Sequence, residues 1–254
     1  RRVKEDVVAD LPEKIEDTVI AQLTGEQRKL YLANQDRIAQ QVQHREASEF
    51  KKDKLKVLAE LTKLRQICCD PRLHYEDYKA GSAKLDTCME LVHGALDGGH
   101  RILLFSQFTG MLDIIGKRLA KEDIAFLKLT GASSKESRAK MVAQFQAGEV
   151  PVFLISLKAG GVGLNLTAAD VVIHYDPWWN VAAQDQATDR AHRIGQQHTV
   201  TVYKLIAKDT IEERIMQMQE SKRDLVNSVL GGDGISSALF TREDVLALLG
   251  GDGR

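Results

Sequence analysis

The sequence predicts an α/β protein with a parallel β-sheet that is covered by helices on both faces. From Ala83 onward, short apolar segments alternate with single segments of helical periodicity, which is the pattern of successive βαβ units. The apolar segments are continuous, as in 101–106, which is typical of strands that are buried on both faces of a sheet. Right-handed crossovers then bring the carboxyl ends of the strands, and the loops that follow them, to one edge of the sheet.

The composition is that of a soluble globular protein, with 254 residues of which 43% are hydrophobic and 28% charged. The net charge of −1 excludes a globally basic protein, so any contact with nucleic acid must come from a local patch. The three cysteines, Cys68, Cys69 and Cys88, form no metal-binding pattern and favour a reducing compartment. No signal peptide and no run of about 18 apolar residues is present, and because the chain starts without Met we expect an internal fragment.

Two helices are expected before the α/β region. Residues 1–23 form an extended leading segment, and Thr24 with Gln27 has the spacing of a capping box that starts a helix. From there to Asp70–Pro71, which ends the second helix, no Gly or Pro occurs, and apolar residues recur at helical spacing. A polar stretch over 43–54 separates the two helices.

Helices and strands then alternate to the end of the sheet. We expect a helix from Ala83 to about Gly94, a strand over 101–106, a helix over 111–120, a strand over 124–129, a helix opened by a capping box of Ser133 and Glu136, strands over 152–156 and 171–175, a helix over 181–194 and a strand over 199–207. Asp209 or Thr210 caps a last long helix that ends near Gly231, and Thr241 with Asp244 caps a short one.

Two arginines on the helix predicted over 181–194 form the first candidate site. Gln186, Arg190 and Arg193 are spaced i, i+4 and i+7, so they share one helix face. Planar guanidiniums suit the γ-phosphate of a nucleotide, where they stabilise the charge that builds up on the phosphoryl oxygens during transfer. The alternative is a surface helix of ion pairs, in which Asp185 and Asp189 neutralise both arginines.

A glycine-rich segment follows the strand predicted over 152–156. Lys158 comes first, and Gly161 and Gly163 let the backbone approach a ribose or a phosphate closely. The alternative is an ordinary tight turn between a strand and the next element.

Polar loops follow two other predicted strands. Ser106 with Gln107, and Thr130 with Gly131, should lie on the same edge of the sheet, where hydroxyl and N–H groups contact phosphodiester oxygens without reading bases. The alternative for these residues is turn chemistry, and for Ser133 it is helix capping.

Both tryptophans of the chain, Trp178 and Trp179, stand at the end of the strand predicted over 171–175. We expect one of them in the core and the other exposed, where it wedges into or stacks on nucleic acid. The lysines of 51–56 form a local positive face, either a solvated helix end or a contact for phosphate or protein. The histidines at 174, 192 and 198 form no metal-binding pattern.

Four segments resemble successive C-terminal helicase motifs of the Swi/Snf-type DNA-dependent ATPases, a family of helicase superfamily two. They are RILLFSQF, LTGASS, SLKAGGVGLNLTAADVVIHYDPWWN and DQATDRAHRIGQ. The segment LRQICCDP resembles the stretch that usually precedes the second lobe of that family. The resemblance covers roughly residues 10–230, and its RAHRIGQ ending is the part most specific to the family.

The resemblance implies a motor of two RecA-like halves, with double-stranded DNA across both. ATP and Mg²⁺ are bound between the halves, mainly by the N-terminal RecA-like lobe that this chain lacks. The implied organisation is a leading segment and helical protrusion over 1–80, a RecA-like C-terminal lobe over 81–208, a brace helix over 209–232 and a tail with a short helix over 233–254. The short protrusion, without a bromodomain or chromodomain, favours a prokaryotic protein of the cytoplasm or nucleoid over a nuclear one.

The resemblance also assigns roles to residues. Arg190 and Arg193 correspond to the arginine fingers of the family, and the ATP-facing positions are Gly161, Gly163 and Gln186. The implied DNA-tracking positions are Ser106, Gln107, Thr130, Gly131, Lys158, Trp178 and Trp179. Relatives commonly have Asn-Pro after the tryptophans where this chain has Asn180–Val181, which makes the loop less rigid. A non-enzymatic scaffold lobe for DNA or protein is the competing interpretation.

We predict that this chain alone hydrolyses essentially no ATP. It contains no G-x-x-x-x-G-K-[ST] phosphate loop and no acidic strand end of the D-E-x-H type, so the lysine, the Mg²⁺ ligands and the base are all missing. A phosphate-release assay of the purified chain, with and without duplex DNA, checks this. Turnover that persists through successive purification steps would contradict it.

Overall fold

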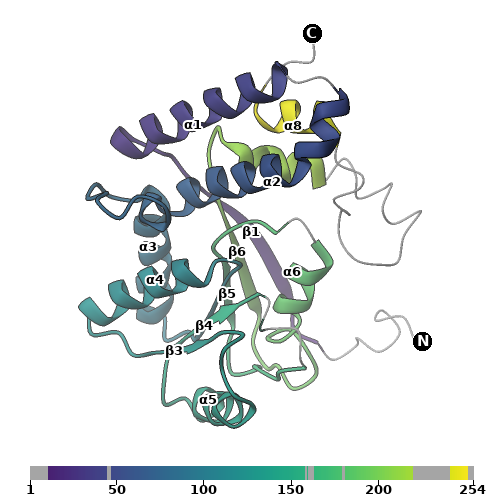
Figure 1. The fold of residues 1–254 in the computed structure, drawn as a ribbon. Helices are drawn as coiled ribbons and strands as arrows, with labels where there is room; N and C mark the ends of the chain where they lie inside the picture. The colour runs from purple at the N-terminus through teal and green to yellow at the C-terminus, as the bar shows by residue number, and fades with distance from the viewer. Residues whose placement is uncertain are drawn as a thin grey trace, which may run out of the picture. The chain divides into compact units, whose positions relative to one another are not determined.

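The computed structural model describes residues 11–44, 47–157, 159, 163–178, 181–219 and 241–250, with only the backbone at 47–49, 51 and 52 (Figure 1). The described residues divide into two compact units. The first falls within Arg1–Val19, Cys88–Trp178 and Ala182–Leu205, and the second within Ile20–Thr87, Trp179–Val181 and Ile206–Arg254. The sequence-based division instead treated 1–80, 81–208, 209–232 and 233–254 as separate parts.

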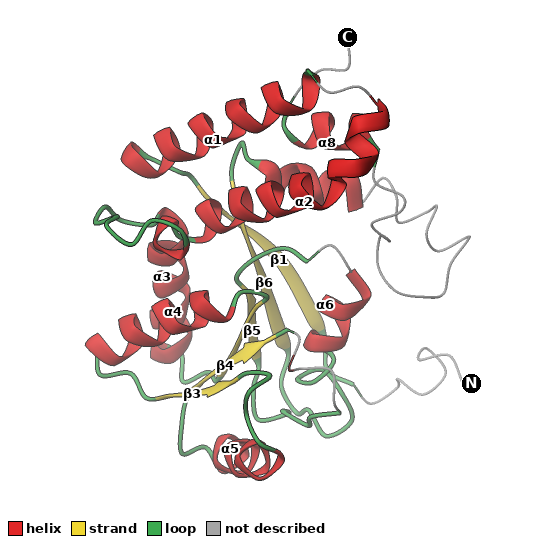
Figure 2. Ribbon diagram, in the orientation of Figure 1, coloured by secondary structure: helices red, strands yellow, loops and turns green. Residues whose placement is uncertain are grey.

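A six-stranded sheet with the order β1-β6-β5-β2-β4-β3 confirms the predicted α/β fold (Figure 2). The strands are β1 (Lys14–Ala21), β2 (Ile102–Ser106), β3 (Phe126–Leu129), β4 (Val152–Ser156), β5 (Val171–His174) and β6 (Val200–Ala207). The pairs β2–β4, β2–β5, β3–β4 and β5–β6 are parallel. The segment expected only as extended thus includes an edge strand, β1, alongside β6.

Helices of the first unit cover both faces of its strands, as the continuous apolar segments predicted. On one face Phe145 of α5 (Lys135–Ala147) and Ala187 of α6 (Val181–Thr188) pack with alternate strand residues such as Leu103 and Phe153. On the other face lies α4 (Thr109–Lys121), where Gly116 approaches Leu154 so closely that a side chain at 116 would touch it. Burial on both faces explains why the central strands carry no polar alternation.

The helices of the second unit surround a separate apolar core. They are α1 (Gly25–Gln43), α2 (Ala47–Cys69), the short 3-10 helix at Pro71–Leu73, the helical residues 211–219 and α8 (Arg242–Leu248), while α3 (Ala83–Asp97) begins in this unit. Residues spaced along one face of each helix, including Tyr31, Leu61 and Ile215, fill this core. The predicted division into two helices is confirmed, because α1 ends at Gln43 and α2 starts at Ala47, well inside the polar stretch.

Two predicted capping boxes are wrong and one is confirmed. Thr24 is the N-cap of α1 but makes no side-chain cap bond. The buried Gln27, whose Oε1 would accept the N–H of Thr24 in a capping box, instead accepts the N–H of Ala83 at 3.1 Å and donates to the carbonyl oxygens of Ile67 (3.0 Å) and Cys68 (3.3 Å). The N-cap of α5 is Ser134, one residue later than expected. The capping box of α8 has both of its predicted hydrogen bonds. Tertiary partners therefore override the local motif where the side chain is buried.

The helix predicted over 181–194 is also wrong at its end, since α6 stops at Thr188 and residues 189–195 form turns. Gln186, Arg190 and Arg193 consequently do not share a helical face. Arg190 N–H bonds to Ala187 O and Ala191 N–H to Thr188 O, which are the shorter i−3 contacts of a tightened chain end.

A fully buried ion pair lies within the second unit. Lys84 Nζ lies 2.7 and 2.6 Å from the two carboxylate oxygens of Glu212, and both side chains have no exposed surface. Glu212 also accepts the N–H of Ala207 at 2.9 Å, so its carboxylate has a second partner besides Lys84.

Among the helices that the structure describes, none has both the length and the apolar character that crossing a bilayer requires.

We predict that Lys84→Met lowers the free energy of unfolding by about 3–5 kcal/mol, because it leaves the Glu212 carboxylate buried without its cation. Urea denaturation of the chain measures this. The matched control is Arg118→Met, which breaks the partly exposed pair with Glu122 and should cost at most about 1 kcal/mol. A loss for Lys84→Met as small as that of the control would show that the buried pair does not hold this unit together.

We also predict a pH dependence from His174 of β5. Burial, followed by the positive charge of Lys204, lowers its pKa to about 3, and its ring stacks on Phe105 and bonds to Thr188. Between pH 6.5 and 3 the unfolded chain therefore binds a proton that the folded chain does not, and stability falls as the pH falls, by at most about 1.4 kcal/mol per pH unit.

The His174→Gln variant should lose this component. Between pH 7.5 and 5 its free energy of unfolding should decline by about 2 kcal/mol less than that of the parent chain. Urea titrations at both pH values compare the two. Parallel declines would mean that folding does not lower the pKa of His174.

Candidate functional site

The residues after α6 form a compact turn, 189–196, which we call the arginine turn. It lies against the segment 163–170, which starts at Gly163 of the glycine-rich stretch. We call this segment the loop segment. Leu166 N–H donates to the carbonyl oxygen of Arg190 at 3.0 Å, and Arg193 Nη1 lies 3.5 Å from the carbonyl oxygen of Leu164. The two sequence motifs that were predicted to face a nucleotide are therefore neighbours in the first unit.

Positive charge concentrates at the arginine turn. Arg190 is 7% exposed, and burial, followed by the charges of Arg193 and Arg138, lowers its pKa. Arg193 is exposed and, within the part of the chain that the structure describes, no carboxylate lies within ion-pair distance of it. A set of guanidiniums that repel one another is stabilised by an oxyanion placed among them.

The sequence analysis did not identify Arg138 as part of this set. Arg138 lies on α5 and donates from Nη1 to the carbonyl oxygen of Ala159 at 3.1 Å, beside the glycine-rich stretch. Nothing in its local sequence marks it, since it looks like any solvent-facing cation of a helix. Only the packing of α5 beside the loop after β4 brings it to the other two arginines.

The other residues predicted to face ATP, together with Lys158 of the predicted DNA contacts, are exposed or lie outside the described residues. Gly163 is exposed, and among the described residues no atom lies within 4 Å of the place where its side chain would start. Gln186 is exposed on α6. Lys158 and Gly161 lie outside the described residues.

Ser106 has a different position from the one predicted. It is completely buried, donates from Oγ to the carboxylate of Asp176, and accepts the N–H of Phe108 at 3.1 Å. Asp176 is also buried and accepts the N–H of Gln107 at 3.3 Å. With no exposed surface, Ser106 cannot touch a phosphodiester directly, and instead it supports the loop that carries Gln107. A carboxylate that reaches back across neighbouring strands gives no signal in the sequence.

The loop after β3 is accessible to solvent at Thr130 and Gly131. Thr130 N–H donates to Ser133 Oγ at 3.1 Å, which fixes the turn, and Gly131 is exposed with no atom near the place of a side chain. Trp178 is half-buried, and its backbone N–H donates to Gln184 Oε1 at 3.4 Å. Trp179 lies outside the described residues.

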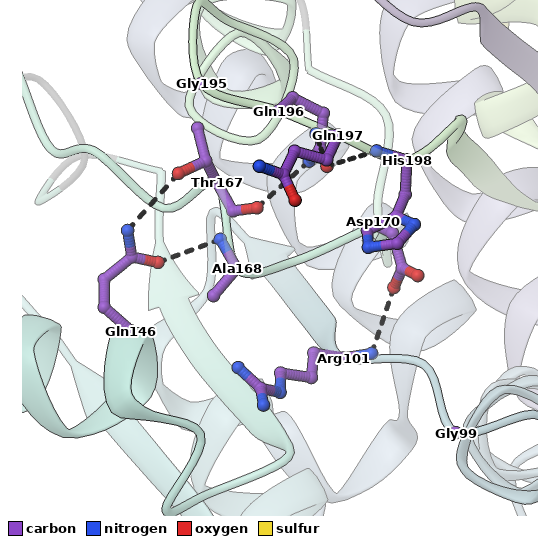
Figure 3. Close-up of a pocket in the computed structure, with 10 residues that line it drawn as sticks. All are labelled: Gly99, Arg101, Gln146, Thr167, Ala168, Asp170, Gly195, Gln196, Gln197 and His198. Atoms are coloured by element: carbon purple, nitrogen blue, oxygen red, sulfur yellow. Dashed lines mark hydrogen bonds between the residues drawn. The ribbon is translucent and has the colours of Figure 1, made fainter.

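A polar pocket of about 390 Å³ opens at the other end of the strands (Figure 3). It is lined by Gly99, Arg101, Gln146, Thr167, Ala168, Asp170, Gly195, Gln196, Gln197 and His198. Arg101 and Asp170 directly precede β2 and β5, so the pocket lies at the amino ends of the strands. The loops after β2 and β3, with the predicted DNA contacts, follow the carboxyl ends. The sequence analysis predicted no pocket here.

Comparison with known families gives two matches that divide the chain. The SNF2-related domain matches residues 1–73, and the helicase conserved C-terminal domain matches residues 83–195. Both the candidate arginines and the loops after β2, β3, β4 and β5 fall within the second match.

Several known proteins are similar to this chain in sequence. The chain is 40% identical to an uncharacterised ATP-dependent helicase of Mycoplasma pneumoniae, over 98% of this chain and 24% of that protein. It is 39% identical to the putative ATP-dependent helicase/translocase YwqA of Bacillus subtilis, over 96% of this chain and 27% of that protein. The human chromatin-remodelling ATPase INO80 is 44% identical over 59% of this chain and 10% of its own length. The chain thus spans about a quarter of the bacterial relatives.

Solved structures show the same fold. The SWI2/SNF2 ATPase C-terminal domain of Sulfolobus solfataricus is 32% identical, with a TM-score of 0.76 over 93% of this chain and 98% of that domain. The SWI2/SNF2 ATPase core of the same organism, solved in complex with double-stranded DNA, is 35% identical, with a TM-score of 0.78 over 96% of this chain and 52% of that core. An archaeal domain is therefore matched along almost its whole length.

Proposed function

Because this chain belongs to the Swi/Snf-type family of helicase superfamily two, as a C-terminal lobe, we propose that it is the second motor half of a DNA-dependent ATPase that translocates on double-stranded DNA. Its relatives are named as ATP-dependent helicases and chromatin-remodelling ATPases. The proposal adds to this the residues of the chain that take part and the task of each.

The observation that carries the proposal is the cluster of Arg138, Arg190 and Arg193. A buried guanidinium whose pKa is lowered by two other arginines, next to the exposed guanidinium of Arg193, is an arrangement that a γ-phosphate would stabilise. In phosphoryl transfer the charge is spread over the equatorial oxygens, and arginines that are already in place stabilise it. Arg190 and Arg193 then act as fingers toward a triphosphate that the N-terminal lobe holds.

The first lobe would supply the rest of the nucleotide site. When bound there, Mg²⁺ neutralises charge on the β- and γ-phosphates. The residues of this chain would position the nucleotide rather than bind its Mg²⁺. Gly161 and Gly163 would let the backbone come near the nucleotide, and Gln186 lies on α6, directly before the arginine turn. This division fits the sequence given, which has neither the phosphate-loop motif with its lysine nor the acidic D-E-x-H type motif.

On the DNA side, the loops at the carboxyl ends of the strands would follow the phosphodiester backbone. Thr130, Gly131 and Gln107 offer polar or backbone groups there, with Lys158 as the cation and Trp178 or Trp179 against the groove. Contacts to the phosphodiester backbone do not depend on the base sequence, so the chain would bind DNA of any sequence. We propose stepping along one strand of an intact duplex rather than strand separation.

The test is Arg193→Ala in the full-length protein that contains this chain. The kcat of DNA-stimulated ATP hydrolysis should fall by about a thousand-fold, as losses of arginine fingers do, while the Kd for duplex DNA stays nearly unchanged. A phosphate-release assay and a DNA-binding titration measure the two quantities. Arg118→Ala, which removes an arginine of α4 from the same unit, is the matched control and should retain full activity.

Lys158→Ala should have the opposite profile. It should weaken DNA binding and lower the slope of log Kd against log salt by roughly one phosphate contact, with a smaller effect on kcat at saturating DNA. If both variants weaken DNA binding equally, the division of labour is wrong. If Arg193→Ala leaves kcat unchanged, the chain is a scaffold lobe rather than a motor half.

A further inference from the structure

We infer that Gln196 is the positioning residue that fixes the arginine turn to the loop segment, and that ATP hydrolysis depends on it through Arg190 and Arg193. The inference rests on the proposed function, since it gives those arginines their role, but it concerns a residue that touches neither nucleotide nor DNA in that proposal.

Gln196 is only 5% exposed, and both the nitrogen and the oxygen of its side-chain amide make hydrogen bonds. Its Nε2 converges on three carbonyl oxygens, at 3.2 Å from Thr167, 2.8 Å from Ala169 and 3.1 Å from Ala191. Its Oε1 accepts the N–H groups of Gln197 and His198, both at 2.9 Å. One amide group therefore satisfies a large share of the backbone around it, in part as shown in Figure 3.

These bonds join the two stretches that bear the candidate site. Ala191 lies between Arg190 and Arg193 in the arginine turn, whereas Thr167 and Ala169 belong to the loop segment. The bond from Leu166 N–H to Arg190 O connects the same two stretches. Gln196 thus holds the backbone from which both guanidiniums extend.

The loop segment is in turn anchored to regular structure. Gln146 of α5 donates to Thr167 Oγ1 at 3.3 Å and accepts the N–H of Ala168 at 2.9 Å. Asp170 accepts the N–H of Arg101 at 3.0 Å, at the start of β2 (Figure 3). The arginine turn is therefore connected through Gln196 to a helix and to the sheet.

This connection matters because the arginine turn lies beyond the end of α6. A residue inside a helix is held by the i→i−4 bonds on both sides of it, but within 189–195 only the N–H groups of Asp189 and His192 make such bonds. Side-chain bonds from Gln196 replace the missing ones. A displacement of about 1 Å in a catalytic group can cost about a hundred-fold in rate, so loss of the anchor should be visible in kcat.

Only an amide side chain of this length can both donate to these carbonyl oxygens and accept from these N–H groups. Glutamate at 196 would keep the acceptor but lose the donor, and would place a charge opposite three carbonyl oxygens. Methionine would fill the space but lose both. Gln197 next to it is exposed and makes no side-chain hydrogen bond with the described residues, so the same change there is a matched control.

The experiment measures steady-state ATP hydrolysis by the full-length protein with saturating duplex DNA. Gln196→Glu should lower kcat by about a hundred-fold, while the KM for ATP and the Kd for DNA change less than about three-fold. Gln197→Glu should behave like the parent protein. Equal activity of the two glutamate variants would overturn the inference.

A double variant separates positioning from general damage to the fold. If Gln196 acts through the two arginines, Gln196→Glu combined with Arg193→Ala should lower kcat by clearly less than the product of the two single losses, because both changes remove the contribution of Arg193. Independent, multiplicative losses would overturn the inference. An unaffected Arg193→Ala variant would instead remove the proposed function, which keeps the two failures apart.

Thermal unfolding of each variant accompanies the kinetics. If Gln196→Glu shows no cooperative transition, the uncharged Gln196→Met variant replaces it and should give the same loss of kcat and the same non-additivity with Arg193→Ala. If neither variant folds, Gln196 is required for the fold as a whole rather than for the arginine turn, which also contradicts the inference.

Discussion

Parallel strands can be joined only through crossovers, and this constraint places every loop that matters in the first unit. The order β6-β5-β2-β4-β3 puts the loops after β2, β3 and β4 at the carboxyl ends of adjacent strands, although they are far apart in the sequence. The same constraint sends the chain back to the amino ends before each new strand, where the polar pocket forms. The loop segment and the arginine turn both return from the carboxyl ends toward β5 and β6, which is why they can lie side by side.

Buried polar side chains then hold these loops in place. Ser106 and Asp176 secure the loop after β2, Gln146 and Gln196 secure the loop segment and the arginine turn, and Lys84 with Glu212 does the equivalent work in the second unit. Each of these groups is costly to bury unless its hydrogen bonds are satisfied, so each bond specifies one arrangement of backbone rather than merely adding stability. The arginines differ from these groups, since the charges of Arg193 and Arg138 lower the pKa of the buried Arg190 instead of balancing its charge.

Several features of the fold and the site were accessible from the sequence because they depend on local chemistry. Runs of apolar residues identified each central strand to within two residues, Asp70–Pro71 ended α2, and Thr241 with Asp244 capped α8. The capping box at Thr24 failed because Gln27 had buried partners some 40 residues away in the chain. The helix through Arg193 failed because the chain tightens after Thr188, where the turn is held by bonds to the loop segment rather than by its own periodicity.

The sequence by itself determined the α/β class, the number of central strands and their positions along the chain, and the motifs that place the chain in its family, because apolar periodicity and motif spacing are properties of neighbouring residues. Only the tertiary structure decided that Ser106 is an interior support, that Arg138 joins Arg190 and Arg193, and that Gln196 bonds five backbone groups. These outcomes depend on which backbone groups and charges meet after the crossovers have formed. That information is spread over segments tens of residues apart, so no single stretch of sequence contains it.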